Sequence, residues 1–289
     1  MKKGLVMEGG AMRGMFTCGV IDVLMDAGIA FDSAIGVSAG ATFGLNYKSK
    51  QVGRPLRYNK KYCNDKRYAS LHSLFTTGDV YNVDFCYNTL PYELDIWDTE
   101  TFYNNPMDFY CVVTDLNTGE AVYHKCDNVD YTPEGADIQW IRASASMPVV
   151  SRPVEIDGGI YLDGGMADSI PLKFMEKQGC DKILVIETQP ADYIKKPQKH
   201  MWLIKLKLGK FKNMIKTMTN RYKVYNEQKA YVKSREESGN VFVIRPEAPL
   251  NIGATENNPD ELQRVYDIGR RTALDCLDKL KSYLGYAVE

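Results

Sequence analysis

The residues best suited to chemistry lie in a stretch of small side chains near the N-terminus. Gly36, Ser38 and Gly40 fit the pattern G-x-S-x-G, with Val37 and Ala39 between them. This pattern places a serine on a sharp strand-to-helix turn, where flanking glycines let the backbone bend and leave the hydroxyl exposed. Ser38 is therefore a candidate nucleophile. For the pentapeptide alone, a glycine-rich turn in which Ser38 only caps the next helix is an equally good interpretation.

A second glycine-rich segment, EGGAMRG at residues 8–14, precedes this turn. Residues 4–7 read as a short buried strand, and the apolar residues after position 15 recur at helical spacing, so the segment is a loop between a strand and a helix. Met15 stands where a P-loop requires lysine, and Ala11 stands where the dinucleotide fingerprint requires its second glycine. The remaining interpretation is an oxyanion site of backbone amides. Its candidate residues are Gly9, Gly10, Ala11, Arg13 and Gly14. Arg13 is either an extra donor or a structural ion-pair partner.

Two D-G-G triplets offer a carboxylate that could act as a base. Asp157 lies between two short β-like runs and is typical of a hairpin turn. Asp163, followed by Gly164 and Gly165, comes at the end of the second run, where a strand can project a carboxylate into a site. In a two-residue arrangement, Asp163 accepts the Ser38 proton directly, which requires contact and a pKa raised by burial.

A serine, aspartate and histidine triad is the alternative arrangement. His200 is the histidine that follows Asp163, so it preserves the order found in α/β-hydrolases. Those enzymes place several strands before the nucleophile, whereas barely one strand precedes Ser38. His124 lies on a predicted strand, and we expect it to be a structural residue, exposed or at the edge of the core, rather than a catalytic one.

Taken together, these segments resemble the patatin-like phospholipases. The resemblance rests on residues 9–14 as the oxyanion loop, residues 36–40 as the nucleophile elbow and residues 163–165 as the family's D-G-G/A motif. ASASMP at residues 143–148, and TDL and TG within residues 114–119, are similar to further family segments.

This resemblance implies a three-layer α/β/α fold with a central, mainly parallel sheet. It also implies a calcium-independent Ser38–Asp163 dyad, without cofactor or metal, that hydrolyses acyl esters of lipids. Ala11 departs from the family, which commonly has a third glycine there; because the donor is a backbone N–H, alanine is tolerable at this position if its φ is negative. The same departure motivates an alternative from another class, a lipid-binding or regulatory protein of this fold with little turnover.

The elements that must position the site occupy residues 1–190, the predicted catalytic domain. Strands are expected at residues 31–37, 109–115 and 182–187, and a helix at residues 39–47. Residues 50–106 are rich in Tyr and Asn, and their composition favours a lid-like insertion of short helices over the core. Two serines, Ser144 and Ser146, fall in a predicted helix over residues 138–147, where we expect them to pack among small residues.

Residues 191–289 read as a C-terminal extension packed on the same core, ending in a strand at residues 241–245 and a helix from residue 258. Between Lys195 and Lys223 there are ten Lys or Arg and no Asp or Glu. Apolar residues recur there at helical spacing, namely Ile204, Leu208, Phe211, Ile215 and Met218. Such a basic amphipathic helix either packs its apolar stripe on the core, which we favour, or lies on an anionic membrane surface.

Composition excludes several other classes of protein. With 289 residues, 44% of them hydrophobic, the chain can bury a sizeable core, and its net charge of −1 gives no general attraction to nucleic acid. Seven cysteines, without a C-x-x-C pair, argue against a disulfide framework or a zinc site and favour a reducing cytoplasm. No stretch approaches the ~20 apolar residues needed to span a bilayer. We therefore expect a cytoplasmic protein, and contact of residues 195–223 with the inner membrane surface stays the alternative to their packing on the core.

Overall fold

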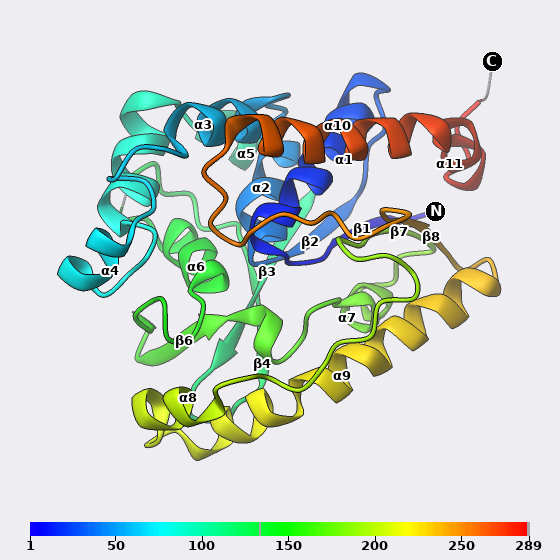
Figure 1. Ribbon diagram of the computed structural model, residues 1–289. Coiled ribbons are helices and arrows are strands. Elements are labelled where there is room, and N and C mark those ends of the chain that lie inside the picture. Colours follow the sequence, from blue (N-terminus) through cyan, green and yellow to red (C-terminus); the bar gives the residue numbers. More distant parts are fainter. Residues whose placement is uncertain (133, 288–289) are drawn as a thin grey trace.

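The computed structural model describes residues 1–132 and 134–287 and is built around one sheet (Figure 1). Among these residues the sheet has eight strands in the order β5-β6-β3-β2-β1-β7-β8, with β4 paired to β3. The strands are β1 (Lys3–Met7), β2 (Ser33–Val37), β3 (Asp108–Asp115), β4 (Ala121–Lys125), β5 (Val154–Ile156), β6 (Gly159–Asp163), β7 (Lys182–Ile186) and β8 (Val241–Ile244). The run from β3 to β8 is parallel, whereas β4, β5 and β6 pair antiparallel.

Helices cover both faces of this sheet (Figure 1). One layer contains α1 (Gly14–Asp26), α2 (Ala39–Lys48), α6 (Ala136–Ala145), α10 (Pro259–Asp275) and α11 (Leu277–Tyr283). The opposite layer contains α7 (Leu172–Lys177), α8 (Met201–Leu208) and α9 (Lys212–Glu237). The expected three-layer α/β/α fold with a mainly parallel sheet is confirmed.

The central strands are apolar on both sides because helices bury both of their faces. In β1, Val6 pairs with Ile35 of β2 and Val185 of β7, and all three side chains are fully buried. The predicted strands all form, with ends that differ by a few residues. Because parallel strands place their carboxyl ends at one edge, β1 and β2 deliver the glycine loop and Ser38 side by side.

Residues 50–106 fold as short helical segments beside α2. They are α3 (Arg54–Tyr62), α4 (Leu71–Thr77), the π-helical segment η2 (Phe85–Leu94) and α5 (Thr99–Asn104). Tyr62, Phe85 and Trp97 are buried in the main core, and the Tyr62 and Phe85 rings meet edge to face at 5.4 Å. Aromatic packing therefore anchors this segment. Lid-like motion of residues 50–106 stays a prediction.

The prediction of one amphipathic helix across residues 204–218 is wrong, because the chain leaves the helix after Leu208 and α9 begins at Lys212. Ile204, Leu208 and Met218 are nevertheless buried, in a cluster with Leu162 and Met166. The interpretation in which the stripe packs on the core is therefore confirmed, and these side chains are not available to a membrane.

The predicted closing helix is divided as well, into α10 and α11 with Cys276 between them. Leu262 and Val265 of α10 and Leu280 of α11 lie in the main core with α1 and α2.

Among the described residues, no helix is both long and apolar enough to cross a bilayer.

Candidate active site

Ser38 occupies the turn that joins β2 to α2. Its backbone has φ 55° and ψ −121°, a conformation that costs a non-glycine residue free energy and is found at nucleophile elbows. The flanking glycines are required by contact: a Cβ on Gly36 would lie 2.3 Å from the carbonyl oxygen of Gly40, and one on Gly40 would lie 2.4 Å from that of Met7. The G-x-S-x-G spacing thus matches the local geometry.

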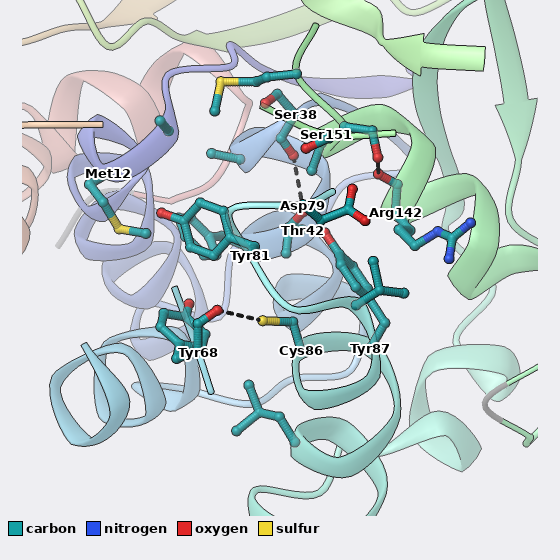
Figure 2. A pocket seen from close by; sticks show the side chains of 18 of the residues that line it. Met12, Ser38, Thr42, Tyr68, Asp79, Tyr81, Cys86, Tyr87, Arg142 and Ser151 are labelled. Atoms are coloured by element: carbon teal, nitrogen blue, oxygen red, sulfur yellow. Dashed lines mark hydrogen bonds between the residues drawn. The ribbon is translucent and has the colours of Figure 1, made fainter. Parts of the chain in front are cut away.

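Two side chains hold the backbone of Ser38. Its amide donates to the Ser144 hydroxyl of α6 at 3.0 Å. Its carbonyl accepts from the Thr42 hydroxyl at 3.2 Å (Figure 2). The expectation that Ser144 only packs among small residues is therefore incomplete. The sequence offered no signal for this contact, because the two serines are distant in the chain.

Asp163 ends β6, is buried, and lies in the same cleft as Ser38. Burial raises the pKa of its carboxyl, while the Ser38 hydroxyl, the charge of Arg221 and the amide of Gly165 act to lower it. The Gly165 amide donates to Asp163 Oδ1 at 2.7 Å. Asp157, in contrast, is exposed in the turn between β5 and β6. Of the two triplets, the one containing Asp163 is the one next to the serine.

The glycine loop runs from β1 into the short helix η1 (Ala11–Arg13). The amides of Arg13 and Gly14 donate within this turn, to the carbonyls of Gly10 and Ala11. Within residues 1–132 and 134–287, no protein acceptor receives the amides of Gly9, Gly10 or Ala11, and all three residues line the Ser38 cleft. The free amides at the start of the loop can thus bind an oxyanion, whereas those of Arg13 and Gly14 are already used.

The condition placed on Ala11 is not met, because its φ is +48° rather than negative. Alanine tolerates this left-handed conformation at a cost of roughly 1–2 kcal/mol. Glycine, which the resemblance leads us to expect here, would adopt this conformation without that cost.

Ser38 lies where two cavities adjoin, and Ala11 and Met147 also line both. The first cavity is mainly apolar and aromatic. Figure 2 shows Ser38 on one side of it, with Tyr68 and Cys86 from residues 50–106 towards the other side. An apolar chain attached to an ester at Ser38 fits such a cavity.

The second cavity is the cleft that contains Asp163 and the glycine loop. It is more polar than the first cavity, and the C-terminal extension lines part of it. Arg221 of α9 donates through Nε to the Gly165 carbonyl at 2.5 Å. Tyr225, one helical turn later, donates to the buried Glu8 carboxylate at 2.6 Å. Neither residue was singled out from the sequence. Their spacing of four on one helix, within a basic segment, was the available signal.

The histidine of the alternative triad lies at the edge of this second cavity. His200 is exposed, and no hydrogen bond or ion pair among the described residues joins its ring to Ser38 or Asp163. The geometry therefore favours direct contact between the serine and the aspartate.

One group away from both cavities has the composition of a metal site. Ligand atoms of His124, Cys126 and Asp137 lie within 4.8 Å of one another. His124 Nε2 and Asp137 Oδ1 are 2.7 Å apart, and the His124 ring stacks on Trp140. These contacts agree with the expected structural role of His124.

Comparisons with known proteins agree with the geometry. A model described as patatin-like phospholipase matches residues 5–175, and one described as a domain of unknown function (DUF6363) matches residues 211–285. An uncharacterized protein, YjjU of Escherichia coli K12, is 27% identical over 279 residues, which are 92% of this chain and 74% of that protein.

Two further proteins are similar to this chain, which covers a different share of each. Lysophospholipase nte1 of Emericella nidulans is 27% identical over 305 residues, covering 96% of this chain but 18% of that protein. This chain therefore spans less than a fifth of that relative. The crystal structure of VipD from Legionella pneumophila matches with a TM-score of 0.50 at 15% identity, over 96% of this chain and 67% of that one, and supports the fold.

Proposed function

The chain belongs to the patatin-like phospholipase family of ester hydrolases, and we propose that it cleaves acyl esters of lipids with a Ser38–Asp163 dyad. Asp163 accepts the hydroxyl proton as Ser38 Oγ attacks the ester carbonyl. The amides of Gly10 and Ala11 stabilise the resulting oxyanion. The proton then passes to the leaving alcohol, and a water molecule activated by Asp163 releases the acyl group and restores the serine.

The observation that carries this proposal is the position of Ser38 between a mainly apolar cavity and a more polar one. A lipid ester has the same two-sided character, with an acyl chain on one side of the carbonyl and a polar alcohol on the other. The raised pKa of Asp163 also suits a base better than that of an ordinary aspartate.

Labelling with a fluorophosphonate probe and turnover of a short p-nitrophenyl ester test this function together. We expect the wild type to be labelled and active, and the Ser38→Ala variant to be unlabelled and inactive while still folded. Full activity in Ser38→Ala would refute the mechanism. A folded wild type that is not labelled would instead favour the lipid-binding or regulatory alternative, for which the strain at Ala11 is the motivating feature.

The triad alternative makes a separate prediction. If His200 relays the proton, His200→Ala should abolish turnover. The dyad predicts at most a small effect, because His200 is exposed at the rim of the cleft.

We also propose that the protein is cytoplasmic and docks on anionic membrane through α8, using a face different from the buried stripe. Trp202 and Leu206 are 64% and 79% exposed, and the exposed Lys205 and Lys210 lie beside them in the chain. Leu203 of the same helix lines the cleft that contains Ser38. Apolar side chains inserted among the headgroups, with each lysine contributing about 1 kcal/mol, would bring the cleft to its substrate.

Co-sedimentation with anionic liposomes tests the docking surface. Trp202→Ser combined with Leu206→Ser should abolish binding, whereas Leu274→Ser, which removes an exposed leucine from α10 on the opposite layer, should not. Binding that is indifferent to salt and to these changes would rule the surface out.

A further inference from the structure

Three partly buried cationic side chains from separate parts of the chain line the cleft of Ser38, and the exposed Lys199 lies at the same cleft. Arg13 comes from the glycine loop, Lys195 from the segment before α8, and Arg221 from α9. All three are partly buried, and in the part of the chain that the structure describes none of them forms an ion pair with a carboxylate. Partly buried cations usually have such partners, so the cluster requires an explanation.

The two carboxylates of this cleft are engaged by other groups. Glu8 accepts from the Tyr225 hydroxyl at 2.6 Å and from the Thr188 amide at 2.5 Å. Asp163 accepts from the Gly165 amide. Neither carboxylate is therefore the direct partner of the three cations.

Each cation is held in place by hydrogen bonds or ring contacts with neutral groups, so that the carboxylates of Glu8 and Asp163 act on these charges from a distance and not through a salt bridge. Arg221 donates through Nε to the Gly165 carbonyl, and this bond does not use its terminal nitrogens. Arg13 Nε lies 3.4 Å from the Thr188 hydroxyl. The Lys195 backbone makes two hydrogen bonds with Asn226, and its amine lies 4.4 Å above the Tyr225 ring.

The three charges also act on one another. Burial, followed by the nearby charge of Arg221, lowers the pKa of Lys195 to about 8, and Arg13 adds to this effect. Burial likewise lowers the pKa of Arg221; the charge of Asp163 opposes this shift, and that of Arg13 adds to it. An anion placed among the three would relieve this repulsion.

We propose that Arg13, Lys195 and Arg221 form a subsite for the phosphate group of an acyl ester, so that residues from the C-terminal extension select phospholipids over neutral esters. The role of this subsite in substrate selection rests on the proposed hydrolytic function. Guanidinium groups bind phosphate oxygens in a bidentate manner, and a lysine adds a third charge. A phosphate bound here lies on the polar side of Ser38, opposite the apolar cavity, which matches the order of groups in a phospholipid.

Binding to the Ser38→Ala protein tests the subsite without turnover. Isothermal titration would compare octanoyl glycerol phosphate, octanoyl glycerol and inorganic phosphate, each kept monomeric. We expect the phosphate ester to bind at least about tenfold more tightly than the neutral ester, since charge-assisted hydrogen bonds are lost with the phosphate. Equal affinity for the two esters would overturn the proposal. Inorganic phosphate that binds as tightly as octanoyl glycerol phosphate would identify a site for the free anion, and would overturn the lipid assignment.

Substitutions assign the preference to these side chains. Arg221→Gln and Lys195→Gln, each in the Ser38→Ala background, should reduce the preference to within about threefold, and Arg221→Lys should retain part of it. Lys223→Gln is the matched control, because Lys223 is exposed on the same helix and does not line the cleft. Two independent positions keep the test valid if one variant fails to fold. A preference that survives both neutral substitutions would overturn the proposal.

The two proposals fail separately. If the wild type turns over esters but shows no phosphate preference, the hydrolytic function stands and the subsite is refuted. If the preference is present but no ester is hydrolysed, the subsite stands and the catalytic proposal fails.

Discussion

The backbone amide of Ser38 donates to the hydroxyl of Ser144 at 3.0 Å, across 106 residues of sequence. This bond is buried and joins the strained turn after β2 to helix α6. Because the amide is used in this way, it is not free to serve as an oxyanion donor. The bond instead holds the backbone conformation that presents the Ser38 hydroxyl.

Ser144→Ala should therefore impair both folding stability and turnover. Loss of the acceptor leaves the Ser38 amide buried and unpaired, which costs about 1–3 kcal/mol in free energy of unfolding. A displaced nucleophile should lower kcat for a p-nitrophenyl ester by about tenfold. Urea unfolding and kinetics would measure the two effects. Ser146→Ala is the stability control, since that hydroxyl donates to the Arg142 carbonyl of the preceding turn. Equal stability of the two variants would contradict the role of Ser144.

Replacing Ser38 itself separates strain from chemistry. Ser38→Ala and Ser38→Gly should both abolish turnover, but only glycine relieves the backbone at φ 55° and ψ −121°. We expect the free energy of unfolding of Ser38→Gly to exceed that of Ser38→Ala by about 1 kcal/mol, so that Ser38→Gly unfolds at a higher urea concentration. Two variants of equal stability would show that the elbow stores no strain.

Asp163→Asn should reduce kcat by about 10³-fold, because an amide cannot accept the serine proton. The substitution is nearly isosteric, and the Asn oxygen can still accept from the Gly165 amide. Asp157→Asn, in the exposed turn before β6, is the matched change and should leave kinetics unaltered. If Asp157→Asn proved the damaging variant, the wrong triplet would have been assigned to the base.

The pH profile of kcat/KM should report the same carboxyl. Catalysis requires Asp163 to be ionised, so activity falls as pH drops through its pKa. Burial raises this pKa, so the fall should occur at a higher pH than for an ordinary aspartate. The positive charge of Arg221 opposes the shift, so Arg221→Gln should move the acid limb to higher pH still, whereas Arg221→Lys should move it less. An unmoved limb in Arg221→Gln would exclude Asp163 as the titrating group.

Sequence motifs predicted one part of the candidate site and gave no indication of the other part. Ser38, Asp163 and residues 9–11 were predicted because each stands in a local pattern of glycines, several of which are required by backbone contact. Ser144 and Arg221 carry no such pattern, since each acts through one hydrogen bond made only in the folded chain.

The fold was predictable in a similar way. Central strands appear in the sequence as short runs of apolar residues, and these runs predicted the parallel sheet. The end of α8 could not be predicted from the sequence, because the apolar spacing continues through Leu208 and Phe211 while the backbone turns at Gly209. Periodicity reports which side chains are buried, and here it remained correct although the helix was interrupted.

A buried ion pair joins α9 to the end of β7. Lys229 Nζ lies 2.7 Å from Glu187 Oε2 at the end of β7, and both side chains are almost fully buried. Arg245 Nε contacts the same oxygen at 2.8 Å. Since α9 also carries Arg221 and Tyr225 into the cleft, this pair links the stability of the extension to the site.

Lys229→Met should lower the free energy of unfolding by about 3 kcal/mol, because it leaves the Glu187 carboxylate buried with one cation fewer. Lys233→Met is the control one turn later: its amine lies 3.9 Å from Glu237, both side chains are exposed, and the expected change is below about 0.5 kcal/mol. Urea unfolding would measure the difference. A loosened α9 should also weaken phosphate-ester binding in Lys229→Met but not in Lys233→Met. If both variants unfold at the same urea concentration, the attachment of α9 does not depend on this ion pair.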